Sequence, residues 1–162
     1  MVKIRGNNPE TGEEFEDQAE NIEKEFIESM SFFEMADEEI KKFIDNLNVS
    51  ADVKALLHSF SKATLRIGER IVKIGKKIIE FVGKVLREFP NASFGLIFGA
   101  IAGFLISSIP ILGLVLGPLV TPILMALGLI AGVVEDIKDK GLARKIAEIN
   151  AKFDNLRPKE AS

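Results

Sequence analysis

The chain of 162 residues contains no cysteine, no tryptophan and no tyrosine, and it has one histidine, His58. Without cysteine it forms neither disulfides nor thiolate metal sites, and a single histidine has no second imidazole with which to bind a metal or activate a nucleophile. No glycine-rich phosphate-binding motif follows a strand-like segment. We therefore expect no enzyme activity, no metal site, no cofactor and no small-molecule substrate.

The amino-terminal segment also lacks an apolar stretch. It begins "MVKIRGNNPETGEEFEDQAE", soon turns acidic, and has none of the features of a secretory signal peptide. We therefore expect the chain to be made and kept in the cytoplasm until another event moves it.

Charge is distributed unevenly along the chain. Residues 1–49 carry fourteen acidic and five basic side chains, a net charge of −9, whereas residues 62–89 carry eight basic and three acidic ones, a net charge of +5. Residues 89–134 carry no charged side chain. This succession of an acidic, a basic and an uncharged segment indicates parts of the chain with different partners or solvents.

The uncharged segment from Phe89 to Val134 is 46 residues long, enough for two membrane-spanning helices of about 20 residues each. Ser108 and Pro110 lie near its middle, in "SSIPILG", and predict the turn of a helical hairpin. In a protein interior the remaining helices would be too few to surround such a hairpin, and self-association would have to complete its cover. The sequence favours a hairpin that inserts into a membrane, with a hairpin hidden in an oligomer as the alternative.

Small residues recur at four-residue spacing within this segment. Such lines form flat grooves at which helices approach closely, a pattern typical of helix contacts in membranes. We expect them to form helix–helix contacts, including contacts between the subunits of a homo-oligomer. The residues are Gly95, Gly99, Gly103, Ser107, Gly113, Gly117, Gly128 and Gly132.

Residues 65–89 follow a seven-residue repeat that, on a helix, sets an apolar face of roughly 150° opposite a face rich in lysine and arginine. Such a helix suits an anionic membrane interface, and its place directly before the uncharged segment favours that role over a bundle helix with a wide core face. Nucleic-acid binding is disfavoured because only one face is basic and the whole chain is acidic. The side chains expected to contact lipid headgroups are Arg66, Arg70, Lys73, Lys76, Lys77, Lys84 and Arg87.

Apolar residues recur mostly at three- and four-residue steps, and no stretch shows sustained period-two alternation. The sequence therefore predicts an all-α fold of amphipathic helices plus an apolar glycine-zipper helical hairpin of two membrane-inserting helices. Asp37 and Ser50 are expected to cap helix starts. The expected segments are a flexible N-terminus (1–13), acidic amphipathic helices (14–49), a long basic amphipathic helix (50–90), the hydrophobic hairpin (91–134) and a C-terminal amphipathic helix with a tail (135–162).

The flanking helices carry apolar faces that need partners. The acidic segment 1–49 is a candidate cover for the basic helix, acting as an autoinhibitory or assembly-directing element, or it is simply the soluble part of the fold. The last helix has an apolar seam at four- and three-residue spacing, expected to pack on another helix of the same or a neighbouring subunit. The seam consists of Leu142, Ile146, Ile149, Phe153 and Leu156.

A charge-free hairpin joined to basic amphipathic helices is similar in pattern to the hydrophobic hairpin of pore-forming colicins. It is also similar to small holins and to the hairpin capsid proteins of some spindle-shaped archaeal viruses. The resemblance covers about residues 62–145 and includes no residue-level motif, and the colicin domain has more shielding helices than this chain. It implies membrane activity without assigning the chain to a family.

These features together predict a membrane-inserting homo-oligomeric protein that forms a pore or permeabilises a membrane, as a toxin-like, holin-like or self-killing effector. The alternative is a structural membrane scaffold, or a virion or envelope protein, without pore activity. The expected partner is a lipid membrane, preferably anionic. Basic residues on both flanks of the hairpin place both termini on the cytoplasmic side of the cell (inner) membrane, with a soluble form before insertion left open.

Overall fold

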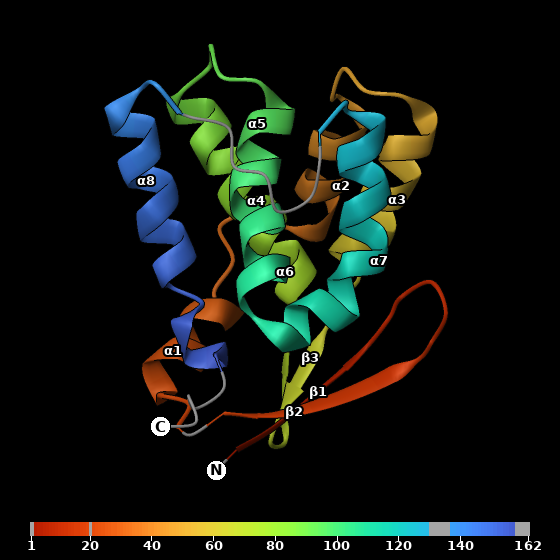
Figure 1. Cartoon of the computed structure of the whole chain (residues 1–162), viewed down its shortest axis with the longest axis vertical. Helices are drawn as coiled ribbons and strands as arrows, with labels where there is room; N and C mark the ends of the chain where they lie inside the picture. The colour runs from red at the N-terminus through yellow and green to blue at the C-terminus, as the bar shows by residue number, and fades with distance from the viewer. Residues whose placement is uncertain (1, 20, 130–136, 158–162) are drawn as a thin grey trace.

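The computed structural model describes residues 2–19, 21–129 and 137–157. A four-stranded antiparallel sheet in the order β2-β1-β3-β4 lies at one end of the molecule, and the helices rise above it (Figure 1). The predicted all-α fold is therefore wrong. The strands are β1 (Val2–Asn7), β2 (Glu14–Ala19), β3 (Leu65–Ile67) and β4 (Arg70–Val72).

Strands β1 and β2 form where the sequence predicted a flexible start followed by a helix. In β1 the buried Ile4 and Gly6 alternate with the exposed Lys3 and Arg5, which is the period-two pattern of a strand with one covered face. Both cations lie within 3.7 Å of the Glu16 carboxylate on β2. A six-residue strand with a glycine at one inward position carries too little alternation to stand out in the sequence.

Strands β3 and β4 replace the start of the predicted helix 65–89. They form a hairpin with a two-residue turn in which Gly68 has a φ of +60°, a left-handed value that glycine adopts without strain. The helix itself begins only at Ile74. The seven-residue repeat is present in the sequence, but its first eight residues are also compatible with a short β-hairpin.

The acidic segment forms two short helices, α1 (Lys24–Ser31) and α2 (Asp37–Asp45), and α3 (Ala51–Ser61) follows. The Ser50 hydroxyl accepts a hydrogen bond from the Val53 N–H at 3.2 Å, which confirms the predicted cap of α3. The cap of α2 is Ala36, so the prediction for Asp37 is wrong by one residue.

Helix α4 (Ile74–Glu88) lies in the middle of the helical layer (Figure 1). Eleven of its fifteen residues are buried, including lysine and glutamate side chains. It contacts α2, α3, α5 and α8, so its wide apolar face is covered by protein. The wide apolar face that suggested contact with a membrane surface is therefore the face with which the central helix packs in the core.

The uncharged segment does form a hairpin with its turn at the predicted place. Its first arm runs through α5 (Phe94–Phe98), the π-helix η1 (Gly99–Gly103) and α6 (Phe104–Ser108). After the extended residue Ile109, α7 (Pro110–Ala126) begins with a proline in its first turn, where the missing N–H is not needed. Gly128, with a φ of +78°, follows the end of α7.

Among the described residues, no helix combines the length and apolar character that crossing a membrane requires. The first arm contains a π-helical segment, α7 has 17 residues, and both arms bury most of their large side chains against the rest of the chain. The predictions of transmembrane helices and of a location in the cell (inner) membrane are therefore wrong. Contacts with α3, α4 and the sheet cover the buried sides of both arms.

Helix α8 (Lys140–Ala151) and the 3₁₀-helix η2 (Asp154–Leu156) end the described chain. The Asp139 carboxylate caps α8 by accepting from the Leu142 N–H at 3.1 Å. All five residues of the predicted seam are buried within the single chain, and Phe153 packs edge-on against Phe81 of α4.

Candidate interaction surface

The first glycine line lies inside the chain's own hairpin. A Cβ atom added at Gly95, Gly99 or Gly103 would have its nearest neighbour 3.4–3.5 Å away, on the side chain of Leu129 or Leu124. Small residues here let the two arms approach closely. These three glycines are therefore used in an intrachain contact, and a contact with a second subunit stays a prediction for them.

The second line, on α7, divides between two environments. A Cβ atom at Gly113 would lie 2.6 Å from the carbonyl oxygen of Ile106, so α6 and α7 meet there backbone to backbone. A Cβ atom at Gly117 would have no neighbour within 4 Å. Only Gly117 of this pair is open to another molecule.

The other predicted contact residues have local roles or lie elsewhere. Ser107 donates its hydroxyl to the carbonyl of Gly103 at 2.9 Å. Gly128 supplies the positive φ after α7, and Gly132 lies outside the described residues. In the hairpin turn, the Ser108 carbonyl accepts a hydrogen bond from Arg157 at 3.2 Å.

The predicted lipid-contacting cations do not share one surface. Lys77 is buried, donating to the Phe32 carbonyl at 2.5 Å and to the Glu80 carboxylate at 3.2 Å. Glu80, only 1% exposed, also accepts the backbone N–H groups of Glu34 and Met35 at 3.0 Å each. This buried cluster fixes the loop between α1 and α2 on α4, and Lys77 does not reach the surface.

Two further cations pair with the acidic segment. Lys76 Nζ lies 2.8 Å from Asp37 Oδ1, and Lys84 Nζ lies 3.0 Å from Glu34 Oε2. The hydrogen bond and charge of each lysine hold the pKa of its carboxyl partner below the ordinary value. The acidic segment thus covers part of the basic helix, as hypothesised, while an inhibitory role stays a hypothesis.

The remaining predicted cations are exposed. Arg66 and Arg70 belong to the β3–β4 hairpin, Lys73 precedes α4, and Arg87 lies near its end. Sequence spacing placed all of them on one helix face, but the hairpin moves the two arginines to the sheet. Headgroup binding by these exposed cations stays a prediction.

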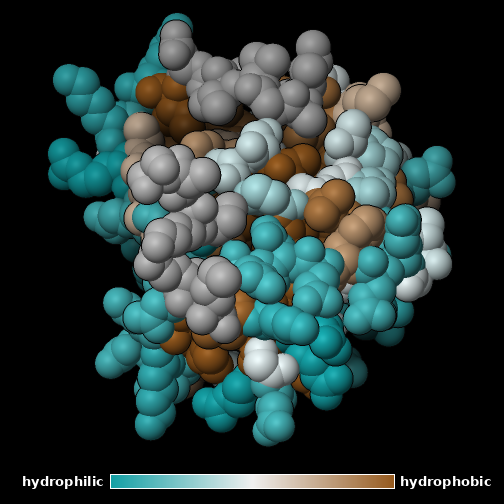
Figure 2. Space-filling view, turned by 60° about the horizontal axis from the view of Figure 1, so that its bottom comes forward, coloured by the Kyte–Doolittle hydropathy of each residue, from teal (hydrophilic) through white to brown (hydrophobic). Residues whose placement is uncertain are grey.

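The outward side of α7 is the feature that the sequence analysis missed. Leu114 is 45% exposed and Met125 is 68% exposed, and no charged side chain lies on the helix. In the space-filling view, apolar and weakly polar residues form a patch bordered by hydrophilic ones (Figure 2). We define the α7 face as its exposed residues, Pro110, Leu114, Pro118, Thr121, Pro122, Met125 and Ala126.

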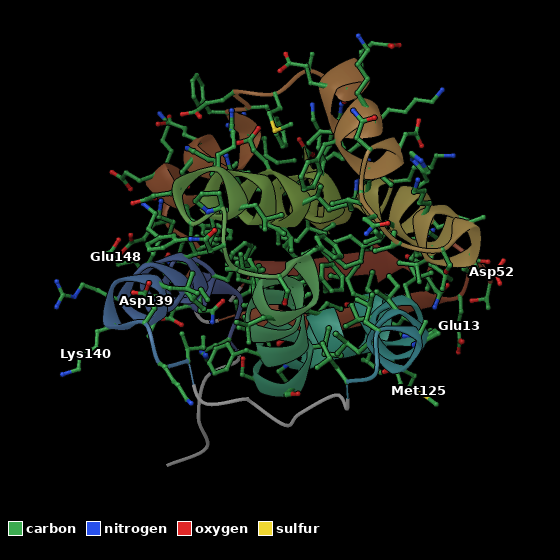
Figure 3. The ribbon with its side chains drawn as sticks, turned by 90° about the horizontal axis from the view of Figure 1, so that it is seen from above. Glu13, Asp52, Met125, Asp139, Lys140 and Glu148 are labelled. Carbon is green, nitrogen blue, oxygen red and sulfur yellow. The ribbon has the colours of Figure 1, made fainter. Side chains whose placement is uncertain are left out.

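The α7 face is uncharged without being purely hydrocarbon. Pro118 and Pro122 have no N–H group, so the carbonyl groups of Leu114 and Pro118 lack the usual donor four residues further on. At the carboxyl end of the helix, Glu13 and Asp52 lie toward the same side of the molecule as Met125 (Figure 3). Carbonyls without that donor and nearby carboxylates both favour a polar medium over lipid hydrocarbon.

No known protein family, curated protein or solved structure matches the chain. Function therefore has to be argued from its surfaces. Within the ranges that the structure describes, no three histidine or carboxylate side chains come together to hold a metal ion. His58 instead lies 2.8 Å from a carboxylate oxygen of Asp45. The α7 face is the most distinctive surface of the described chain.

Proposed function

We propose that this protein is a self-associating structural protein whose subunits meet through the α7 face. The observation that carries the proposal is a whole outward helix side without charge, on which leucine and methionine are exposed. Contiguous exposed apolar patches, when they are large, are typical of interaction sites. A homo-oligomer was also the partner expected from the sequence.

A second copy fits this face for electrostatic reasons. An uncharged surface offers nothing to a charged partner, whereas two identical uncharged faces meet without leaving a charge unpaired. A two-fold arrangement would set each α7 face against its twin, with Gly117 allowing close approach. Lipid is a weaker partner, because the Glu13 and Asp52 carboxylates on the same side of the molecule (Figure 3) would be costly to place in hydrocarbon.

The size of the α7 face determines how strong the self-association is expected to be. A helix of 17 residues is about 25 Å long, and a face about 10 Å wide gives roughly 250 Å² per subunit. Two such faces bury about 500 Å², less than the roughly 1,200–2,000 Å² of stable complexes. We therefore expect weak association that depends on protein concentration, strengthened where further subunits or flanking surfaces join.

This proposal keeps the scaffold alternative from the sequence but removes its transmembrane part. Permeabilisation of membranes stays a prediction. It would require the hairpin to leave the contacts with α3, α4 and the sheet that now cover it.

The test is sedimentation equilibrium across a wide range of protein concentrations. Wild-type protein is expected to show a reversible rise in mass, and Leu114→Glu and Met125→Glu should abolish it because each buries a carboxylate in the contact. The control is Phe32→Glu, which changes a side chain that is 65% exposed in the loop after α1. It should associate as wild type does.

A wild-type protein that stays monomeric at every concentration contradicts the proposal. So does equal association of the control and the two α7 variants. Flotation with neutral vesicles provides a second arm: vesicle binding that is lost in Leu114→Glu, without self-association, would assign the face to lipid instead.

A further inference from the structure

A groove of about 520 Å³ opens where α2, the end of α3 and the start of α4 meet (Figure 1). Its volume lies within the roughly 300–1,000 Å³ typical of small-molecule sites. Three elements contribute basic side chains to its lining, which are Lys41, His58, Lys62, Lys73 and Lys76. Asp37 is the only acidic residue that the described ranges contribute to the lining. With the histidine neutral, four lysines and one aspartate give the lining a net charge of +3, although the whole chain has a net charge of −3.

Three of these lysines are not engaged in ion pairs within the described part of the chain. Lys41, Lys62 and Lys73 are all exposed, and no described carboxylate oxygen lies within 4.0 Å of their ammonium nitrogens. The chain has 24 acidic residues, so a shortage of carboxylates does not explain this. A groove of this volume spans about 8 Å, which is about the Debye length at physiological ionic strength. The lysines therefore repel one another across the groove and all attract an anion placed in it.

Backbone contacts hold two walls of the groove in place. The Gly75 N–H donates to the Ala63 carbonyl at 3.1 Å, and a Cβ atom added at Gly75 would collide with the backbone carbonyl of Phe60. The end of α3 and the start of α4 therefore meet backbone to backbone. This contact keeps Lys62 and Lys73, which are distant in sequence, at one groove.

Lys76 is the least mobile cation of the groove. It is only 8% exposed, and its Nζ lies 2.8 Å from Asp37 Oδ1 and 4.1 Å from the centre of the Phe33 ring. The Asp37 side chain is 77% exposed, so water screens this ion pair. An anion in the groove would be repelled by the Asp37 carboxylate, which therefore lowers the affinity of the groove for anions.

The arrangement of the lysines suits phosphate. Each lysine carries a compact charge with three N–H donors on a flexible stem, so exposed lysines on three elements can turn toward one ligand from different sides. A phosphate group presents three strong acceptor oxygens, whereas a carboxylate presents two in one plane. Two phosphate groups carry about three to four negative charges at pH 7, close to the opposite of the charge of the lining.

We propose that this groove binds a small anion carrying two phosphate groups. Lys41, Lys62 and Lys73 would bind the phosphate oxygens, and Lys76 would add its charge from the buried wall. The same chemistry is found in a soluble diphosphate and in the phosphorylated headgroup of a lipid. The groove shares no residue with the α7 face, so this site does not depend on self-association.

The binding test uses inorganic pyrophosphate, with citrate as a control of similar charge that has carboxylates in place of phosphates. Pyrophosphate should bind saturably at one site in isothermal titration, and the amide signals of Lys62 and Thr64 should shift in NMR spectra. Affinity should fall as salt is added, because the contacts are between exposed charges. Citrate reaches fewer of the lysines with its planar groups and should bind at least about fivefold more weakly.

Four variants locate the site. Lys62→Gln and Lys73→Gln should each weaken pyrophosphate binding at least about fivefold, since each removes one charge from the groove. Lys140→Gln makes the same change on α8, on the opposite side of the molecule from Asp52 of α3 (Figure 3), and should leave binding unchanged. Asp37→Asn removes the carboxylate from the lining and should tighten binding at least about fivefold. Damage to the fold would not produce such a gain.

Flotation with vesicles distinguishes the two sources of phosphate. Phosphatidylcholine vesicles containing phosphatidylinositol bisphosphate are compared with vesicles of equal charge containing phosphatidylserine. Binding to the phosphoinositide vesicles alone, displaced by pyrophosphate, would identify the ligand as a lipid headgroup. Pyrophosphate binding without vesicle binding would identify it as a soluble diphosphate.

Four results would overturn the proposal. Absence of saturable pyrophosphate binding would show that the lysines only keep this surface solvated. Equal affinities for pyrophosphate and citrate would contradict the selection of phosphate. An effect of Lys140→Gln equal to that of Lys62→Gln, or no gain of affinity in Asp37→Asn, would place the binding outside the groove.

Discussion

Alanine substitutions at Gly113 and Gly117 should change stability in opposite directions, although both glycines lie on α7 one turn apart. In a helix interior alanine is more favourable than glycine by about 0.8–1.0 kcal/mol. At Gly117 nothing opposes this gain, because the new Cβ would have no neighbour within 4 Å. We expect Gly117→Ala to stabilise the protein by close to the full amount.

At Gly113 a steric contact opposes the same gain in helix propensity. The new Cβ would lie 2.6 Å from the carbonyl oxygen of Ile106, whereas ordinary contacts begin at 3.4 Å. The contacting atom belongs to the backbone of α6, so the clash can be removed only if the last turn of α6 moves away from α7. Overpacking of this kind costs about 1–3 kcal/mol, which leaves a net loss of up to about 2 kcal/mol.

The assay is urea and thermal unfolding followed by circular dichroism, at protein concentrations low enough to avoid self-association. For a chain of this length 1 kcal/mol corresponds to about 2–4 °C in Tm. Gly117→Ala should raise Tm by about that amount and Gly113→Ala should lower it. A Gly113→Ala protein as stable as Gly117→Ala would refute the close contact between α6 and α7.

Three further predictions concern α4 and its partners. Glu80→Gln should lower the free energy of unfolding by about 3–5 kcal/mol in urea titrations, since it leaves the buried Lys77 ammonium without its counter-charge. A loss below about 1 kcal/mol would contradict the buried ion pair. Gly75→Ala should prevent stable folding, because the added Cβ would collide with the backbone carbonyl of Phe60. Amide dispersion in NMR spectra measures this, and a well-dispersed spectrum would show that α3 and α4 are not in contact there. Lys76 lowers the pKa of Asp37 in the folded state, so the stabilisation from this pair is present above the unfolded pKa near 4 and is lost as pH falls through the folded value. The stability difference between wild type and Asp37→Asn should therefore shrink as the pH falls below 4, and a difference that does not change with pH would argue against the pair.

Sequence patterns predicted local features well where a single chemical rule decides them. The Ser50 cap and the turn between Ser108 and Pro110 both follow from missing or added hydrogen-bonding groups, and both occur. The π-helix could not be predicted in this way, because the spacing of its residues is also that of an α-helix.

The sheet and the role of the uncharged segment could not be predicted, because both depend on contacts distant in sequence. Gly6 of β1 is an example, since an added Cβ would lie 2.5 Å from a methyl group of Val115 on α7. No residue near Gly6 in the sequence indicates that Val115 packs against it. An apolar helix covered by a sheet and an apolar helix covered by lipid have the same composition, and only the tertiary contacts distinguish them.

The buried cluster formed by Glu80, Lys77 and the loop between α1 and α2 also determines how the molecule unfolds. The amide protons of Glu34 and Met35 are bonded to a carboxylate in the centre of α4, so their exchange with solvent should follow the opening of the core. The acidic segment and α4 then behave as one cooperative unit in hydrogen exchange. Separating them would leave the Lys77 ammonium and the Glu80 carboxylate without their backbone partners, so any release of this segment in a membrane-active form would coincide with loss of the native core.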